Sequence, residues 1–166
     1  GVALKGERSA HAARNDLALP EPLEFDLDET PLPQGKIGDL SISRVLLGGN
    51  LLTHYTHSRD LKYVYNLCAH YNTDEKIIET MALAERHGVN TLVVHTVPRI
   101  LDTLKRYREE YGGAIQRIIC PTIHVEIDPK GYAAQVRDLV ALGVEAVYLW
   151  GVTADRLVAQ GNMDAI

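Results

Sequence analysis

The chain has 166 residues, enough for one domain but fewer than the roughly 250 residues of a complete (β/α)8 barrel. Its apolar content of 46% and charged content of 23% are ordinary globular values, which exclude a disordered or fibrous chain. The net charge of −5 with scattered Lys and Arg argues against a nucleic-acid partner, and no apolar run reaches the roughly 18 residues of a membrane span.

The first 40 residues show no sustained hydrophobic period. Residues 17–40 are rich in proline and acidic side chains, which predicts an extended arm, with a hairpin near Gly35 to Asp39 as one option. We therefore divide the chain into an arm over residues 1–40 and a body over residues 41–166. Gly1 in place of an initiating Met leaves two compartments open, the cytoplasm and export after signal cleavage.

The body alternates between apolar runs typical of buried strands and segments with helical periodicity. Helix starts are marked by Asn72 with Glu75 as a capping box, by Pro98, and by Asp128 before Pro129. Glycines follow the expected helices. The predicted strands are 43–48, 89–95, 114–124 and 144–150, and the predicted helices are 72–87, 98–111, 128–142 and one from 153, with a short helix over 61–71.

Strand and helix repeat in this order three times, which predicts parallel strands joined by crossover helices. Two architectures fit, an open doubly wound sheet and a (β/α)8 barrel. A dinucleotide-binding doubly wound domain carries Gly-x-Gly-x-x-Gly after its first strand, and the glycines at Gly48 are followed by a different sequence. We therefore favour an α/β fold of the barrel type.

Several segments resemble the aldo/keto reductases. GKIGDLSISRVLLGGN is similar to the opening of that family, in which a hairpin closes the barrel floor, and TDEKIIETMALAERHGVNTLVVHT is similar to its first helix and second strand. HSRDL and DRLVAQGNMDAI resemble an uncharacterised bacterial group of aldo/keto-reductase-like proteins. The resemblance covers Pro33 to Ile166 and implies about the first four of eight units of a TIM barrel.

The catalytic tetrad of that family is not matched. The resemblance places His95 where the family has an aspartate, and it finds no lysine in CPTIHVE and no histidine in LWG. Tyr55 lies in a different loop from the catalytic tyrosine. The family holds its nicotinamide cofactor largely with the second half of the barrel, so NADP is the less favoured cofactor and reductase chemistry is not transferred.

Polar residues gather where the predicted strands end, the position of active sites in such barrels. His57 and Asp60 could form an oriented acid/base pair with His95 nearby, and Arg59 could hold a carboxylate, a phosphate or vicinal hydroxyls. Asp60 could equally cap the helix over 61–71, and Arg59 could pair with an acid. The predicted catalytic residues are His57, Asp60 and His95, and the predicted substrate-binding residues are Asn50, Arg59 and Trp150, the last as an apolar platform.

A metal site is a further hypothesis. His124 and Glu126 are two residues apart and would point the same way in an extended chain, and His95 would end the neighbouring strand. Such a ligand set suits zinc, manganese or iron(II). In the alternative interpretation His124 is a wall residue and Glu126 only precedes the helix cap Asp128.

Three functions remain open from the sequence. The first is an aldo/keto-reductase-like enzyme that acts on a sugar-like or other carbonyl substrate by isomerisation or elimination, with or without a divalent metal. The second is an NADP-dependent reductase. The third is a non-catalytic half-barrel completed by another chain, since free sheet edges predict an oligomer.

Overall fold

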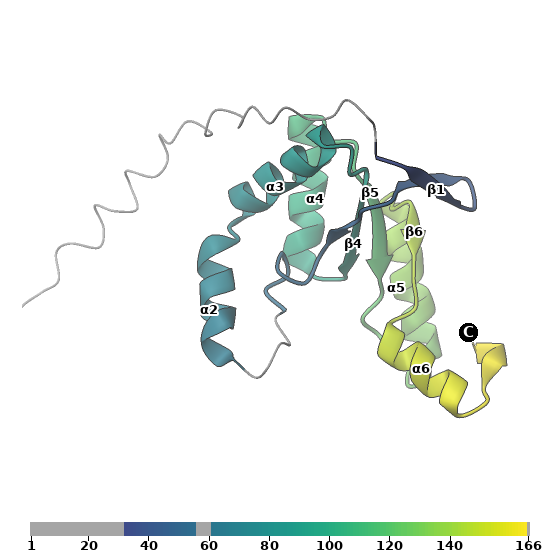
Figure 1. Ribbon diagram of the computed structural model, residues 1–166. Helices are drawn as coiled ribbons and strands as arrows, with labels where there is room; N and C mark the ends of the chain where they lie inside the picture. Colours follow the sequence, from purple (N-terminus) through teal and green to yellow (C-terminus); the bar gives the residue numbers. More distant parts are fainter. Residues whose placement is uncertain (1–31, 56–60, 166) are drawn as a thin grey trace, which may run out of the picture. The chain divides into compact units, whose positions relative to one another are not determined.

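The computed structural model describes residues 32–55 and 61–165, which form a mixed α/β arrangement around a four-stranded parallel sheet (Figure 1). None of the described helices has the length and apolar character that a bilayer crossing requires. The strands are β1 (Gln34–Ile37), β2 (Leu40–Ser43), β3 (Leu47–Gly48), β4 (Thr91–His95), β5 (Gln116–Cys120) and β6 (Ala146–Val147). The helices are α2 (Lys62–Tyr71), α3 (Asp74–Arg86), α4 (Pro98–Tyr111), α5 (Pro129–Ala141) and α6 (Gly151–Ala159), followed by the 3-10 helix η1 (Met163–Ala165).

The main sheet follows the order of the chain. Its strands lie in the order β3-β4-β5-β6, and each neighbouring pair is parallel. His95 at the end of β4 stands opposite Cys120 at the end of β5. The parallel α/β arrangement predicted from the alternation of strands and helices is therefore confirmed for the described residues.

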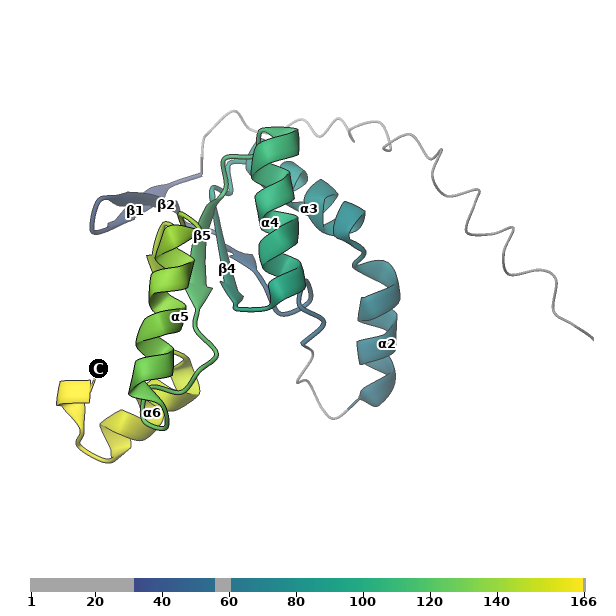
Figure 2. The same ribbon diagram turned by 180° about the vertical axis from the view of Figure 1, so that it is seen from behind.

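Helices α4 and α5 lie on the same face of β4 and β5, behind the strands in Figure 1 and in front of them in Figure 2. Side chains from both layers meet in one apolar core. Because side chains alternate along a strand, the residues between the core-facing ones turn to the other face of the sheet. The core includes Leu92, Val94 and Ile119 from the strands and Ile100, Leu104 and Leu139 from the helices.

The antiparallel hairpin of β1 and β2 is fixed to the amino ends of β4 and β5. The backbone oxygen of Ser41 accepts hydrogen bonds from Asn90 Nδ2 at 2.9 Å and from Gln116 Nε2 at 2.7 Å. The hairpin pairs Gln34 with Ser43, so β2 crosses the boundary that the sequence placed after residue 40. The loops that follow the strands lie at the opposite end of the sheet, where the strands end.

The helix boundaries follow the capping signals with one correction. The predicted cap Asn72 is wrong: Thr73 is the N-cap of α3, and its hydroxyl accepts from the Lys76 backbone N–H at 3.3 Å. Asn72 instead donates through Nδ2 to the backbone oxygen of Leu51 at 3.1 Å. Asp128 caps α5 as predicted, accepting from the Gly131 N–H at 2.9 Å.

The strands are shorter than the apolar runs that predicted them. The strand expected over residues 114–124 ends at Cys120, because Pro121 follows and cannot donate to the ladder. β3 and β6 have two residues each, although the sequence predicted strands over 43–48 and 144–150. His124 and Glu126 therefore belong to the loop between β5 and α5.

Candidate functional site

A pocket of about 290 Å³ lies where the strands of the main sheet end. It draws residues from the last positions of β4 and β5 and from the segments that follow β3 and β6, so side chains far apart in the sequence share one space. The carboxyl ends of parallel strands are the usual place for ligands in α/β folds. The pocket is lined by Asn50, Tyr55, His95, Cys120, Tyr148, Trp150 and Gly151.

The structure brings together three residues that the sequence predicted for the site. Asn50, His95 and Trp150 all line the pocket. Sequence reasoning missed Tyr148 because the predicted strand ran past it to Trp150, and it interpreted Cys120 only as a buried thiol. The structure shows that Cys120 is the last residue of β5 and lies opposite His95, whereas the sequence predicted a strand that continued to residue 124.

His95 is the polar centre of this pocket. Its ring meets that of Tyr55 edge to face, with 5.5 Å between centroids and 73° between planes. Burial lowers the pKa of His95 below its ordinary value of 6.5, because the charged imidazolium loses hydration. The ring is therefore neutral at pH 7, and one of its nitrogens can accept a proton.

Cys120 and Tyr148 form a second, weakly polar wall. Cys120 is 1% exposed, and its thiol donates to the backbone oxygen of Pro121 at 3.2 Å. Burial raises its pKa to about 11, and the Tyr148 hydroxyl lowers it only in part. Burial and the neighbouring thiol likewise raise the pKa of Tyr148. Both groups are thus neutral at pH 7, and a thiolate nucleophile is not formed there.

The structure does not bring the predicted metal set of His95, His124 and Glu126 together. No three His, Cys, Asp or Glu side chains of the described residues lie close enough together to hold a metal ion. The prediction needed an extended chain at His124, but residues 124–127 turn back, with the Ile127 N–H donating to the His124 oxygen at 3.1 Å.

The side chains of this turn have other partners. His124 Nδ1 lies 3.2 Å from Thr153 Oγ1, and its ring centroid is 5.4 Å from that of Trp150. Glu126 forms an ion pair with Arg156 at 3.2 Å and is 3.8 Å from His124. His124 is therefore a wall residue behind Trp150, as the alternative interpretation proposed.

His54, another histidine after the first strand, has a structural environment. Its backbone has φ 60, a left-handed conformation that is uncommon outside glycine. Its Nε2 lies 3.0 Å from the Asn72 oxygen and 3.1 Å from Arg99 Nη2, and Arg99 also donates to Leu52 O and pairs with Asp74. This cluster joins the loop after β3 to α3 and α4. The predicted residues His57, Arg59 and Asp60, further along this loop, lie outside the described residues.

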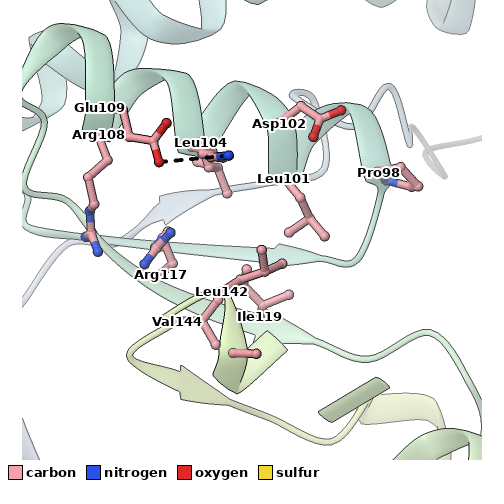
Figure 3. A pocket seen from close by; sticks show the side chains of 12 residues that line it. Pro98, Leu101, Asp102, Leu104, Arg108, Glu109, Arg117, Ile119, Leu142 and Val144 are labelled. Atoms are coloured by element: carbon pink, nitrogen blue, oxygen red, sulfur yellow. Dashed lines mark ion pairs between the residues drawn. The ribbon is translucent and has the colours of Figure 1, made fainter. Parts of the chain in front are cut away.

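A second cavity, of about 550 Å³, lies between α4 and α5 on the helix-covered face of the sheet (Figure 3). Apolar side chains such as Leu101 and Ile119 form its floor, and charged groups stand along it. Its buried guanidinium, Arg117, is already bound to Glu145 at 3.2 Å and to the Gly143 oxygen at 2.5 Å. We therefore assign this cavity to the packing of the helices rather than to the candidate site.

Comparison of the chain with protein-family models, with curated proteins and with solved structures finds no significant match. The geometry of the strand-end pocket is therefore the basis for assigning a function to the chain. The resemblance to aldo/keto reductases stays a prediction.

Proposed function

We propose that the described residues are the first units of a (β/α)8 barrel of the aldo/keto-reductase-like type. Three features support this architecture: the strands follow the chain order, α4 and α5 cover one face, and a hairpin lies at the amino ends of the strands. In a doubly wound sheet the chain order reverses at a switch point and helices cover both faces. Sequential order with helices on one face is the arrangement of a closing barrel.

We further propose that the protein is an enzyme that moves a proton next to a carbonyl group of a small sugar-like substrate. The observation that carries this proposal is the neutral His95 imidazole in a strand-end pocket beside the Tyr55 ring. A base whose pKa lies somewhat below the working pH is free to accept a proton. This proton transfer does not require a metal ion bound by His124 and Glu126.

The proposed proton transfer needs no reactant other than the substrate and the protein. The His95 imidazole removes a proton from the carbon next to the carbonyl, and the electron pair of that C–H bond forms a carbon–carbon double bond. The carbonyl oxygen gains the negative charge, and a hydrogen bond from a phenol such as Tyr55 would stabilise it. The former carbonyl carbon then receives the proton from His95, the hydroxyl on the neighbouring carbon loses its proton, and the former carbonyl oxygen gains one. The neighbouring carbon thereby becomes the new carbonyl, so aldoses and ketoses interconvert.

Exchange of carbon-bound hydrogen in D2O tests this activity without knowledge of the product. Proton NMR of small aldoses and ketoses, with dihydroxyacetone as the smallest probe, should show protein-dependent loss of the signal next to the carbonyl. His95→Gln should slow this exchange by about 100-fold or more, the size of a general-base contribution. His70→Gln, on the exposed side of α2, is the matched control and should leave the rate unchanged.

Two results would overturn the proposal. One is the absence of protein-dependent exchange with every carbonyl probe. The other is an equal rate for His95→Gln and the unchanged protein. Oxidation of NADPH in the presence of the same probes would instead support the alternative reductase function.

A further inference from the structure

Trp150 is held from behind by side chains that the proposed reaction does not use. The His124 ring lies against the indole with a 31° angle between the planes, and His124 Nδ1 contacts the hydroxyl of Thr153, which is 1% exposed. Glu126, paired with Arg156, lies 3.8 Å from His124. With one side of the indole packed in this way, the remaining surface of Trp150 is the part that lines the pocket.

The described lining of the pocket contains no Lys, Arg, Asp or Glu. Its titratable groups His95, Cys120 and Tyr148 have pKa shifts that keep them neutral at pH 7. A bound phosphate or carboxylate would lose hydration there without a counter-charge, which costs several kcal/mol. The described part of the lining therefore favours an uncharged ligand.

The volume of the pocket and the chemistry of its walls indicate the class of ligand more closely. A volume of about 290 Å³ is at the lower end for small-molecule pockets, roughly 300 Å³, so it suits a single ring. An aromatic side chain on one wall can cover the C–H face of such a ring. The imidazole of His95 and the hydroxyl of Tyr148 can exchange hydrogen bonds with hydroxyl groups at its edge.

We propose that the pocket selects an uncharged, polyhydroxylated ring, such as a neutral monosaccharide, which stacks on Trp150, and that His124 is a positioning residue for the indole. This proposal rests on the proposed function, because it names the substrate class of the same site. From the described lining, sugar phosphates and sugar acids are expected to bind more weakly than neutral sugars. It also separates recognition of the ring, by Trp150, from the chemistry at His95.

The chain has one tryptophan, so its fluorescence reports directly on this pocket. Methyl glucoside, which has no free carbonyl, should change the Trp150 emission with saturation in the millimolar range. Glucose 6-phosphate and gluconate should bind at least tenfold more weakly. No saturable change with methyl glucoside or free glucose, or equal affinity for the phosphate, would overturn the proposal. Tighter binding of tetramethylammonium would do so as well, since it would identify a cation site among aromatic rings.

Variants test the platform and its support, with binding measured by calorimetry because the fluorophore is lost in some of them. Trp150→Ala should weaken methyl glucoside binding by at least tenfold, and Trp150→Phe should restore most of it. His124→Ala should shift the emission of Trp150 and weaken binding about threefold to tenfold, whereas His70→Ala should do neither. Unchanged binding in folded Trp150→Ala would reject the platform. Unchanged emission and binding in folded His124→Ala would reject its positioning role. Circular dichroism establishes that each variant is folded.

Saturation-transfer NMR on the unchanged protein tests the stacking directly. It should show transfer of magnetisation from aromatic protons of the protein to the C–H protons of the bound sugar. The absence of this transfer would also reject stacking.

The two proposals can fail separately. Binding of methyl glucoside without hydrogen exchange in any carbonyl probe would leave the ring site in place and reject the enzymatic function. Exchange in dihydroxyacetone without binding of any sugar ring would leave the function in place and reject the ring site.

Discussion

At the scale of single residues, Glu145 shows how charge is used away from the site. Its carboxylate accepts from Arg108 Nη1 at 2.8 Å, from the Arg117 backbone N–H at 2.7 Å and from Arg117 Nε at 3.2 Å. Burial alone would raise the pKa of Glu145, but the hydrogen bonds from the two arginines outweigh it, and the net pKa lies below the ordinary 4.5. The ionised carboxylate therefore stabilises the folded chain.

Glu145→Gln should lower the free energy of unfolding by about 2 kcal/mol at pH 7, because two arginines lose their charged partner. Since the folded pKa is lowered, the contribution of Glu145 is complete above the unfolded pKa of about 4.5 and is lost as the pH falls through the folded pKa. Urea unfolding at pH 7 and at successive pH values below 4.5 measures this effect. The difference in the free energy of unfolding between the variant and the unchanged protein should become smaller as the pH falls. Glu109→Gln, in an exposed pair with Lys105 at 4.0 Å, is the control and should change stability by less than about 0.5 kcal/mol. Equal losses in the two variants would contradict the role of Glu145.

His95 should give the proposed activity a characteristic pH dependence. The base must be unprotonated, and burial lowers its pKa below 6.5, so hydrogen exchange should be constant above about pH 6.5 and fall as the pH drops through the lowered pKa. Proton NMR in D2O across pH 5 to 8 measures this profile. An exchange rate still rising between pH 7 and 8 would point to a base other than His95.

The same residues show how much of the site the sequence could predict. Asn50 follows paired glycines, and His95 and Trp150 end apolar runs, so their strand-end positions could be recognised from the printed sequence. Cys120 and Tyr148 could not be assigned to the pocket, because the predicted strands continued past them to residues 124 and 150. The alternation of side chains along a strand does not show where the strand ends. His124 was misplaced for the same reason: the apolar run continued beyond the strand.

At the scale of elements, the last residue of β3, Gly48, and the next residue, Gly49, differ in the space around them. A Cβ on Gly49 would lie 2.5 Å from the Val94 Cβ and 2.7 Å from the Val93 oxygen, whereas a Cβ on Gly48 would meet nothing within 4 Å. Gly49→Ala should therefore push β3 away from β4 and lower the free energy of unfolding by about 2 kcal/mol. Gly48→Ala is the matched control, with a change below about 0.5 kcal/mol. Urea unfolding followed by circular dichroism compares them, and similar stabilities would contradict the close approach.

The start of α3 allows a second test at this scale. Thr73→Ala removes the oxygen that accepts from the Lys76 N–H and should lower the free energy of unfolding by about 1 kcal/mol. Thr73→Ser keeps a hydroxyl and should restore most of this loss in thermal unfolding. If the serine variant were as unstable as the alanine variant, capping would not be the cause.

Helices were easier to predict than strands for a physical reason. A helix carries its own end signals, such as Asp128 with Pro129, and Gly112 in the left-handed conformation that ends α4. A strand ends where its neighbour stops pairing, which depends on residues elsewhere in the chain. β6 therefore stops at Val147 although the apolar run continues to Trp150.

At the scale of the whole molecule, the main sheet has two edges on which the described residues supply no neighbouring strand. β3 pairs only with β4, and β6 pairs only with β5, within residues 32–55 and 61–165. Exposed apolar side chains flank the first of these edges, with Val45 at 52%, Leu46 at 44% and Leu51 at 56%. Backbone groups on such an edge can pair with another chain, and apolar neighbours strengthen the contact. The order of the strands could be predicted from the sequence. The strand that pairs with each edge could not, because the sequence of an edge strand does not indicate which other segment pairs with it.

We therefore expect the chain to self-associate through the β3 edge. Leu46→Lys, directly before β3, places a charge at this edge and should weaken association by about tenfold, which corresponds to about 1.4 kcal/mol. Val140→Lys on α5 is the control, because Val140 is exposed, at 62%, and α5 contacts β6 at the opposite edge of the sheet. Sedimentation equilibrium over a range of protein concentrations measures both. A stable species of 18.4 kDa for the unchanged protein at all concentrations would contradict association, and an equal effect of the two lysines would place the contact elsewhere than β3.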